Sequence, residues 1–534
     1  MKEYKILFKP SRRSVSCSAR TDILSCCREN RIEIDSVCGG QGKCRSCRVR
    51  IEKGTVSPPA PNELKKLSHD ELERGWRLAC QTRPAGDLII YLPPDKGLTS
   101  TPAFKEELLA RVVPNHRVRS TGRIYGVAVD LGTTKIAGYL IDLTDGCILS
   151  SCAVANPQAI YGDDVISRIT YAMSSNDGGR KLQKKAIAAI DDLIGELCRS
   201  ADCAPGLIIK VSICGNTAMH HLLLGLPVDQ LARAPYLPWT KDPVDISANE
   251  LGLKSASDAG VYLLPNIGGY VGGDHVAVLA ATDAGNLKSA TLIVDIGTNT
   301  EISLAGDDDI TSVSCASGPA FEGGHIKHGM KASAGAIDKI VIKDGRVGYR
   351  TIGGHRPAGI CGSGILDVVA QMSGAGIIDS GGRMHRDHPL VRVNGGQPEI
   401  LIAGRDRSAS DEDIVITQGD IRELQLAKAA IRTGINVLLR SADMVARDVR
   451  RVIIAGTFGN YIDIKSAIRV GMLPDLPLRR FSQVGNAAGA GACMVLVSTA
   501  ARKKAEAMAS RVKYLELADR PDFMELFVRA LSIG

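Results

Sequence analysis

The segment YGVAVDLGTTKIAGYLID, residues 125–142, decides the fold of most of this chain. Its apolar first half predicts a buried strand that delivers Asp130 to its end and then turns tightly at Gly132. In the turn, backbone N–H groups and the hydroxyls of Thr133 and Thr134 can hold phosphate oxygens. By itself this turn is a weak signal, because an aspartate before a glycine turn occurs by chance in many hairpins.

A second copy of this strand-turn-strand design lies in TLIVDIGTNTEISLAG, residues 291–306. There Asp295 ends the strand, and the turn is formed by Gly297, Thr298, Asn299 and Thr300. Two such hairpins that face each other would clamp a triphosphate from both sides, with Asp130 and Asp295 near Mg²⁺ through water. The internal repeat therefore predicts an ATP site between two lobes.

Two segments rich in small residues predict helices that cross between the lobes. The first is GGYVGGDHVAVLAATDAG, residues 268–285, and Asp274 near its start is a candidate for orienting the attacking water. The alternative is that Asp274 is the N-cap of this helix, after Gly272 and Gly273. The second is GNAAGAGACMVL, residues 485–496, for which hinge packing is a better interpretation than catalysis.

A third segment, RVIIAGTFGNYI at residues 451–462, is similar to an adenosine motif. In such motifs a strand ends in glycines, so that adenine can lie against bare backbone. Gly456 and Gly459 are the predicted contacts. Glu322, in the turn-rich segment CASGPAFEGG, is expected on the cleft side, where it either lines the γ-phosphate or only shapes a loop.

The N-terminal segment DSVCGGQGKCRSCRVRIEKG, residues 35–54, holds three closely spaced cysteines. Cys38, Cys44 and Cys47 follow C-x5-C-x2-C, and 32 residues separate Cys47 from Cys80. Three thiolates from one loop and a fourth from a distant strand form the ferredoxin arrangement for a 2Fe-2S cluster. Zinc is the main alternative, although structural zinc usually takes two C-x2-C pairs and the second pair is absent here. Unligated thiols are the remaining interpretation.

Most of the 15 cysteines lie alone in apolar runs and are expected in the core, as small hydrophobic residues. Examples are Cys147, Cys214, Cys361 and Cys493. His220 and His221 are adjacent on a predicted helix, so they face different ways and cannot both chelate one metal. We expect them in the core or on the lobe surface.

Composition limits the partners. Residues 1–95 carry 18 Lys and Arg against 12 Asp and Glu, so +6 of the formal net charge of +8 lies there. This basic end should prefer an acidic protein partner, unless it is only a solvated face. A nucleic-acid partner is not expected, because aromatic residues make up only 4% of the chain and no recognition motif is visible.

The N-terminus lacks the pattern of a signal peptide, so a cytoplasmic location is expected. Residues 481–501 contain no acidic or basic side chain before Arg502, but polar residues and glycines dilute them. This stretch predicts a buried helix rather than a membrane span, and no membrane association is expected.

The pattern of predicted strands, helices and turns divides the chain into three parts. Residues 1–93 predict a small α+β domain, residues 94–122 a linker with a short polar helix around Phe104 to Arg111, and residues 123–534 an α/β region with parallel strands. The two phosphate hairpins, the crossing helices and the adenosine motif follow the pattern of the actin, sugar-kinase and chaperone ATPase superfamily.

The whole chain resembles the reductive activators of corrinoid proteins. The resemblance rests on the cysteine segment followed by RLACQT, and on GNTAMHHLLLGL, CASGPAFEGG, CGSGILD, TQGDIRELQLAKAAIRTGI and AGTFGNYIDI in this order. It implies a β-grasp ferredoxin domain joined to a two-lobed actin-like ATPase with ribonuclease-H-like lobes. It also implies a 2Fe-2S cluster, ATP and Mg²⁺ as cofactors.

The function implied by this resemblance is the one-electron reduction of inactive Co(II) to Co(I) in a corrinoid protein that serves a methyltransferase system. The partners would be that corrinoid protein and an electron donor protein, and the chain would form a homodimer through its ATPase part. The cluster would supply the electron, and ATP binding or hydrolysis would give the reaction its direction.

Three other functions stay open at this point. The first is activation of another low-potential enzyme, such as a dehydratase, although such activators generally lack an N-terminal ferredoxin domain. The second is an electron-transfer adaptor that senses ATP without hydrolysing it. The third is a small-molecule kinase, although a kinase would have no use for the ferredoxin domain.

Overall fold

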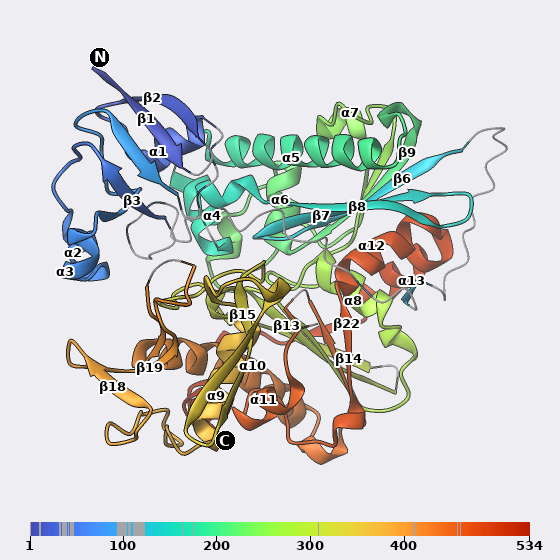
Figure 1. Ribbon diagram of the computed structural model, residues 1–534. Helices are drawn as coiled ribbons and strands as arrows, with labels where there is room; N and C mark the ends of the chain where they lie inside the picture. Colours follow the sequence, from blue (N-terminus) through green and yellow to red (C-terminus); the bar gives the residue numbers. More distant parts are fainter. Residues whose placement is uncertain are drawn as a thin grey trace.

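The computed structural model describes residues 2–9, 12–30, 32, 34, 40, 42, 47–92, 104, 108–109, 123–162, 164–174, 176–307, 309–409, 412–456, 458–459 and 461–534. These residues form a small N-terminal domain and two larger lobes, which lie one above the other in Figure 1. The predicted ligands Cys38 and Cys44, and most of the predicted linker helix, lie outside the described residues.

The N-terminal domain has a mixed five-stranded sheet in the order β2-β1-β5-β3-β4. Its elements are β1 (Glu3–Lys9), β2 (Arg13–Ser18), α1 (Ile23–Glu29), β3 (Arg48–Lys53), α2 (Pro61–Lys66), α3 (His69–Glu73), β4 (Trp76–Leu78) and β5 (Leu88–Tyr91). The first and last strands, β1 and β5, are parallel neighbours, which is the β-grasp arrangement. Alternation in β1 buries Ile6 and Phe8 against α1, so this domain has its own core.

Lobe I is built on a six-stranded sheet in the order β10-β11-β9-β6-β7-β8. Its strands are β6 (Tyr125–Leu131), β7 (Lys135–Asp142), β8 (Ile148–Ala155), β9 (Ile208–Gly215), β10 (Val244–Ser247) and β11 (Gly260–Leu263). Its helices are α4 (Val165–Ser174), α5 (Gly178–Ser200), α6 (Thr217–Leu224), α7 (Ala248–Leu251) and α8 (Gly273–Ala281). The long helix α5 is amphipathic, and it buries Leu182, Ile190 and Leu197 against the sheet.

Lobe II repeats this plan with the order β22-β21-β12-β13-β14-β23. Its main strands are β12 (Thr291–Ile296), β13 (Thr300–Gly306), β14 (Asp309–Cys315), β21 (Arg451–Ala455), β22 (Phe481–Gly485) and β23 (Lys513–Tyr514). In both lobes an antiparallel three-stranded meander is extended by parallel strands on the side of its first strand.

The remaining elements of lobe II are two small sheets and six helices. The small sheets contain β15 (Ala336–Lys343), β16 (Arg346–Thr351), β17 (Gly359–Ile360), β18 (Val391–Asn394), β19 (Gln397–Ala403) and β20 (Ile414–Thr417). The helices are α9 (Gly362–Gly374), α10 (Gln418–Ser441), α11 (Ile464–Arg469), α12 (Ala487–Val497), α13 (Thr499–Ala509) and α14 (Phe523–Ala530).

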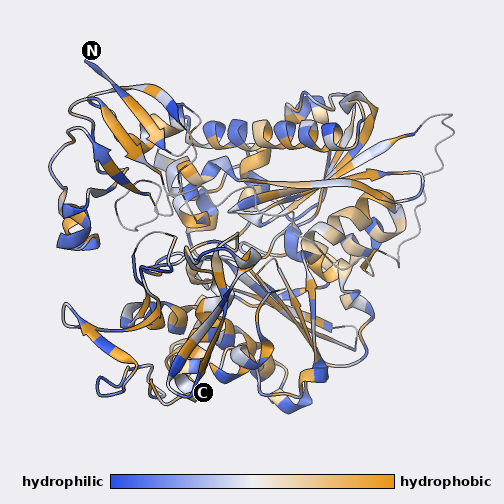
Figure 2. Ribbon diagram, in the orientation of Figure 1, coloured by the Kyte–Doolittle hydropathy of each residue, from blue (hydrophilic) through white to orange (hydrophobic). Residues whose placement is uncertain are grey.

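Two helices lie between the two large sheets, at the place where the sequence predicts the hinge. Every residue of α12 is buried, as expected for a helix that is apolar on all sides, and α8 packs along it. A Cβ added at Gly491 of α12 would lie 2.1 Å from the carbonyl oxygen of Ala277 in α8, so only glycine allows this close crossing. Figure 2 shows hydrophobic residues concentrated in this central layer and in the strands on either side.

The described linker residues pack against these two helices and the strands beside them. The backbone of Phe104 pairs with Gly485 at the end of β22, and its ring lies 5.2 Å from the ring of Tyr139 in β7. Leu108 is buried in the same hydrophobic cluster. The segment that leaves the ferredoxin domain therefore contacts both lobes where they meet.

Three expectations from the sequence are wrong. His220 and His221 are buried, but they do not face different ways, because their Nδ1 atoms lie 3.3 Å apart. Cys147 is exposed in the turn between β7 and β8, so an apolar neighbourhood in sequence did not place it in the core, whereas Cys214, Cys361 and Cys493 are buried. Residues 481–501 do not form one helix, because Gly485 adopts a positive φ of 75° and ends β22 before α12 begins. Among the described residues, no helix has the length and apolar character needed to cross a membrane.

Candidate nucleotide and cluster sites

The two predicted phosphate hairpins face each other across the cleft. The β6–β7 turn (residues 132–134, loop 1) and the β12–β13 turn (residues 297–299, loop 2) bring the hydroxyl oxygens of Thr134 and Thr298 to 3.3 Å. A Cβ added at Gly132 would lie 2.7 Å from the carbonyl oxygen of Lys135, so the turn requires glycine. The repeat in the sequence is thus a single site in space.

Side chains from distant segments hold loop 1 in place. Asn156 donates to the carbonyl of Gly132 over 2.9 Å, and Asn216 donates to the hydroxyl of Thr133 over 2.9 Å. The guanidinium of Arg168 in α4 donates to the carbonyl of Thr133. All three side chains are buried, so loop 1 is fixed by hydrogen bonds that water does not weaken.

Loop 2 is held from its own lobe by the segment after β14. The hydroxyl of Ser317 donates to the carbonyl of Gly297 at 3.1 Å, and it also lies 2.8 Å from the hydroxyl of Thr300. The backbone N–H of Gly318 donates to the carbonyl of Thr298 over 3.1 Å. Asn299 is partly exposed at the tip of the turn.

Two aspartates stand at the strand ends behind these loops. Burial raises the pKa of Asp130 to about 6, although a 2.9 Å hydrogen bond from Asn486 opposes the shift. Burial, with Asp274 and Asp130 nearby, raises the pKa of Asp295 to about 8. At neutral pH a pKa of about 8 leaves Asp295 mostly protonated, and a metal bound with phosphate would favour the ionised form of both carboxylates.

Asp274 belongs to the same acidic group but is not a helix cap. The N-cap of α8 is Gly272, and Asp274 lies in the first turn, where it accepts a 2.8 Å hydrogen bond from the backbone of His275. Burial is the main reason that its pKa is raised to about 7, and the charge of Asp130 adds to the shift. Among the described residues, no three His, Cys, Asp or Glu side chains converge as a metal-ion site, so any cation here would also need water or phosphate ligands.

The predicted adenosine motif lies next to loop 2. Gly456 has a φ of 89°, and its N–H donates to the carbonyl of Gly485 over 2.9 Å. A Cβ at Gly456 would lie 2.4 Å from the carbonyl oxygen of Ile296, and one at Gly459 would lie 2.3 Å from that of Ala455. Both glycines are therefore required by close backbone packing.

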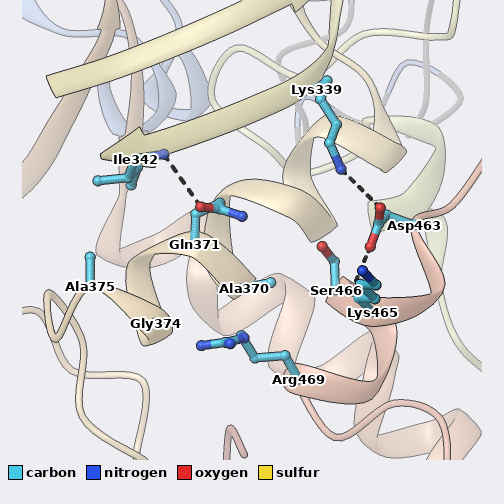
Figure 3. A pocket seen from close by; sticks show the side chains of 10 residues that line it. All are labelled: Lys339, Ile342, Ala370, Gln371, Gly374, Ala375, Asp463, Lys465, Ser466 and Arg469. Carbon is cyan, nitrogen blue, oxygen red and sulfur yellow. Dashed lines mark hydrogen bonds and ion pairs between the residues drawn. The ribbon is translucent and has the colours of Figure 1, made fainter. Parts of the chain in front are cut away.

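A cavity of about 500 Å³ opens beside this motif, between β15, α9 and α11 (Figure 3). At one side Lys339 forms ion pairs with Asp463 at 2.9 Å and with Asp367 at 3.3 Å. Gln371 lines the cavity from α9 and accepts a 3.3 Å hydrogen bond from the backbone of Ile342. The lining combines apolar surface with acidic and basic side chains, which suits a ligand with both apolar and polar parts, such as a base with a sugar.

Two of the four predicted cluster ligands are described, and they lie together. The sulfur atoms of Cys47 and Cys80 are 3.4 Å apart. A tetrahedral metal with bonds of about 2.3 Å to sulfur separates two of its ligands by about 3.8 Å, so this pair fits one metal atom. Gln81 donates to the sulfur of Cys80 at 3.6 Å and to the carbonyl of Gly40 at 3.3 Å, which ties the cysteine loop to the fourth ligand.

A buried ion pair supports the strand that leads to Cys80. Glu63 in α2 is fully buried, and its carboxylate accepts hydrogen bonds from Arg77, Thr82 and the backbone of Leu78. These hydrogen bonds outweigh the effect of burial, so the pKa of Glu63 is lowered. The arrangement fixes both ends of the turn that carries Cys80.

Known proteins match this chain along its whole length. Residues 7–85 match the 2Fe-2S iron-sulfur cluster binding domain, residues 125–286 the RACo middle region, and residues 289–534 the C-terminal domain of RACo, the ASKHA domain. The corrinoid activation enzyme RamQ of Eubacterium limosum is 30% identical, over 99% of each chain. The chain belongs to the reductive activators of corrinoid proteins.

Other members of this group agree. A solved structure described as a reductive activator for corrinoid, iron-sulfur protein is 33% identical, covers 99% of this chain with 98% of its own, and gives a TM-score of 0.72. The [Co(II) methylated amine-specific corrinoid protein] reductase of Methanosarcina barkeri is 25% identical over 68% of each chain. Membership in the activator family confirms the predicted fold, a ferredoxin domain followed by an actin-like ATPase.

The sequence of this activator did not disclose the residues that support the site. Arg168 looks like one charge of an amphipathic helix, and Asn156 lies alone before a proline. Only Asn216 carried a signal, because it directly follows the apolar run of β9 and precedes a helix, as an N-cap does. The cavity side chains Lys339 and Gln371 come from segments with no motif.

Proposed function

We propose that the chain carries out the ATP-dependent reductive activation of a corrinoid protein, in which cobalt is reduced from Co(II) to Co(I). The observation that carries the proposal is the presence, in one chain, of paired cluster thiols and of two phosphate loops that meet at Thr134 and Thr298. A relative of matching length is named a corrinoid activation enzyme. A kinase would need the loops but not the thiols.

The ferredoxin domain would hold a 2Fe-2S cluster through Cys38, Cys44, Cys47 and Cys80, and the bound cluster would supply one electron to the corrinoid. The residues around the two described ligands are arranged for such a group. Gln81 directs an N–H group at the sulfur of Cys80, and an N–H donor favours the ionised thiolate that binds metal. Gly42 has a φ of 69°, and a Cβ there would lie 2.9 Å from the side chain of Gln81.

The lobes would bind ATP with Mg²⁺. The phosphates would be held by Gly132, Thr133 and Thr134 of loop 1, by Gly297, Thr298 and Asn299 of loop 2, and by Thr300 at the start of β13. Gly456 and Gly459 would face the adenosine, and we assign the base and ribose to the cavity between α9 and α11 because α11 directly follows these glycines. Asp130 and Asp295 would reach Mg²⁺ through water, and Asp274 would orient the attacking water for hydrolysis.

ATP is needed because Co(II) is difficult to reduce. For a one-electron transfer, each 59 mV of unfavourable potential lowers the equilibrium constant about tenfold. Closure of the lobes on ATP would change the hinge at α8 and α12, and Phe104 of the linker contacts that hinge. The nucleotide and the ferredoxin domain could thus affect each other through contacts within one chain.

We assign residues 1–93 to the ferredoxin domain, 94–122 to the linker and 123–534 to the ATPase. The charge of the ferredoxin domain and the state of the cysteines indicate its partners and its compartment. The basic first domain suits an acidic electron donor protein or an acidic face of the corrinoid protein. No two of the described cysteines form a disulfide bond, which suits a reducing compartment such as the cytoplasm.

The test measures ATP turnover of the cluster-loaded protein under anaerobic conditions. We expect turnover to rise at least about tenfold when a Co(II) corrinoid protein is added, and not with a panel of small alcohols, sugars and acids. Stimulation by a small substrate, with transfer of phosphate to it, would instead show a kinase. ATP-dependent Co(I) formation without any phosphate release would show the non-hydrolysing adaptor.

A further inference from the structure

Glu322 joins the two phosphate loops in this structure. It is the last residue of a short 3-10 helix, η6 (Pro319–Glu322), and its carboxylate spans the cleft. One oxygen accepts a 2.6 Å hydrogen bond from the hydroxyl of Thr298 in loop 2. The other accepts a 3.2 Å hydrogen bond from the hydroxyl of Thr134 in loop 1.

The position of this carboxylate conflicts with the expected ligand. Thr134 and Thr298 are the two hydroxyls that the facing loops present to a phosphate, and Glu322 uses both. A phosphoryl group accepts the same hydrogen bonds and carries the same sign of charge, so the two anions cannot occupy the place together. Lys135, beside Thr134, is close enough for the charge of Glu322 to favour its protonated form, although burial lowers its pKa overall.

The surroundings of Glu322 connect it to the other end of the nucleotide site. Its neighbour Phe321 is buried and stacks on Phe458, at a distance of 4.7 Å between ring centroids. Phe458 lies between Gly456 and Gly459 in the adenosine motif. The flanking residues Gly318 and Gly323 both have positive φ, at 73° and 81°, so η6 is bounded on each side by a turn that favours glycine.

We propose that Glu322 is an internal anion that holds the place of the terminal phosphate and must release Thr134 and Thr298 when ATP binds. The inference rests on the proposed ATP-binding function and adds to it the residue that gives up its hydrogen bonds when the terminal phosphate binds. Glu322 links loop 1 of one lobe to loop 2 of the other, and ATP exchanges its phosphate for the carboxylate. Movement of Glu322 reaches the adenosine motif through the stacked rings of Phe321 and Phe458.

The direction of the change in ATP affinity on loss of the Glu322 charge distinguishes this exchange from other roles of Glu322. If Glu322 competes with phosphate, loss of its charge strengthens binding of ATP, with or without Mg²⁺. A carboxylate that holds Mg²⁺ would give the opposite result, because its loss weakens binding of the magnesium complex and leaves metal-free ATP unchanged. A residue that only shapes the loop would change neither.

The experiment compares Glu322→Gln with the wild-type protein, using the full, cluster-loaded chain and calorimetry. The probes are a non-hydrolysable ATP analogue, with Mg²⁺ and with EDTA, and adenosine. The matched control is Glu423→Gln, which makes the same change in a carboxylate that pairs with His325, three residues after Glu322, and that makes no hydrogen bond to Thr134 or Thr298. Glu322→Ala serves as a second variant in case the amide disturbs folding.

We expect Glu322→Gln to bind the analogue about tenfold more tightly in both buffers. Adenosine, which has no phosphate, should bind within about twofold of wild type, and Glu423→Gln should behave as wild type. An unchanged or weaker affinity for the analogue in both Glu322 variants would overturn the inference while leaving ATP binding intact. A wild-type protein that binds neither probe would overturn the proposed function and this inference with it.

Discussion

The two phosphate loops have nearly the same sequence but different support. Loop 1 is held by buried side chains from three separate segments, Asn156, Arg168 and Asn216. Loop 2 is held by Ser317 and by backbone of the segment that leads to Glu322. The difference indicates that loop 1 is a fixed platform, whereas loop 2 is coupled to a segment that changes partners when a phosphate arrives.

The aspartates behind the loops show the same asymmetry. The carboxylate of Asp130 receives a hydrogen bond from Asn486, whereas the carboxylate of Asp295 receives none from the described residues. The pKa of Asp295 is accordingly raised further, to about 8, compared with about 6 for Asp130. Loop 2 therefore has more to gain from the cation that accompanies ATP.

Replacement of Arg168 should have the largest effect. Arg168→Met removes the donors to the carbonyls of Thr133 and Gly162 without opening a large cavity. We expect the free energy of unfolding to fall by about 3 kcal/mol and ATP affinity by about 100-fold, measured by denaturation and calorimetry. The control is Arg180→Met on the exposed side of α5. Equal results for the two variants would show that loop 1 does not depend on Arg168.

The aspartates predict a pH dependence of stability in the absence of nucleotide and metal. Both pKa values lie above the value of about 3.9 in an unfolded chain, so the folded protein binds these protons more tightly. Their contribution to the free energy of unfolding is therefore present below about pH 4 and is lost as pH rises through the folded values. We expect thermal stability in EDTA to fall between about pH 5 and pH 8.

Asparagine substitutions separate the two aspartates in this measurement. Asp295→Asn should reduce the fall in the free energy of unfolding at pH 8 more than Asp130→Asn does, by about 1 kcal/mol or more. The reason is that the pKa of Asp295 is raised further than that of Asp130. The same pH profile in wild type and Asp295→Asn would contradict the asymmetry.

Removal of the Ser317 hydroxyl should have a smaller effect than loss of Arg168. Ser317→Ala removes the hydrogen bonds to Gly297 and Thr300, at a cost of about 1 kcal/mol. We expect ATP affinity to fall about tenfold in calorimetry, and Ser317→Thr to restore most of it. A larger loss than that of Arg168→Met would reverse the assignment of the fixed loop.

Phe104 should have the smallest effect on affinity, because it contacts the hinge rather than either loop. We expect Phe104→Ala to bind ATP within about threefold of wild type but to lose most ATP-dependent Co(I) formation. The control is Tyr139→Phe, which keeps the ring beside Phe104 and removes only the hydroxyl that receives a 3.1 Å hydrogen bond from Asn486. Retained Co(I) formation in Phe104→Ala would show that the linker contact does not transmit the nucleotide state.

The sequence predicted the parts of the molecule that are formed by short motifs of neighbouring residues. The repeated turn at Asp130 and Asp295 indicated the two-lobed fold, and the cysteine spacing indicated the first domain. Both are short motifs in which neighbouring residues act together. Cys147 was misjudged because an apolar run does not tell which residue falls in the turn.

The contacts of the supporting residues could not be predicted because they join distant parts of the chain. Arg168 lies 35 residues from Thr133. Glu322 was expected on the cleft side, but its hydrogen bond with Thr134, 188 residues away, was not. Their roles depend on the packing of α4 and η6, which no local pattern specifies. The alternative role of Asp274 as a helix cap was excluded only by the dihedral angles at Gly272.

The most direct test of the account is a single-turnover experiment followed by electron paramagnetic resonance. The reduced, cluster-loaded protein is mixed with a Co(II) corrinoid protein and frozen with ATP, with ADP or without nucleotide. The account predicts that the signals of the reduced cluster and of Co(II) disappear together, in equal amounts, only with ATP. Loss of the Co(II) signal without nucleotide, or its persistence with ATP while ATP is bound, would contradict the claim that the phosphate loops control the electron.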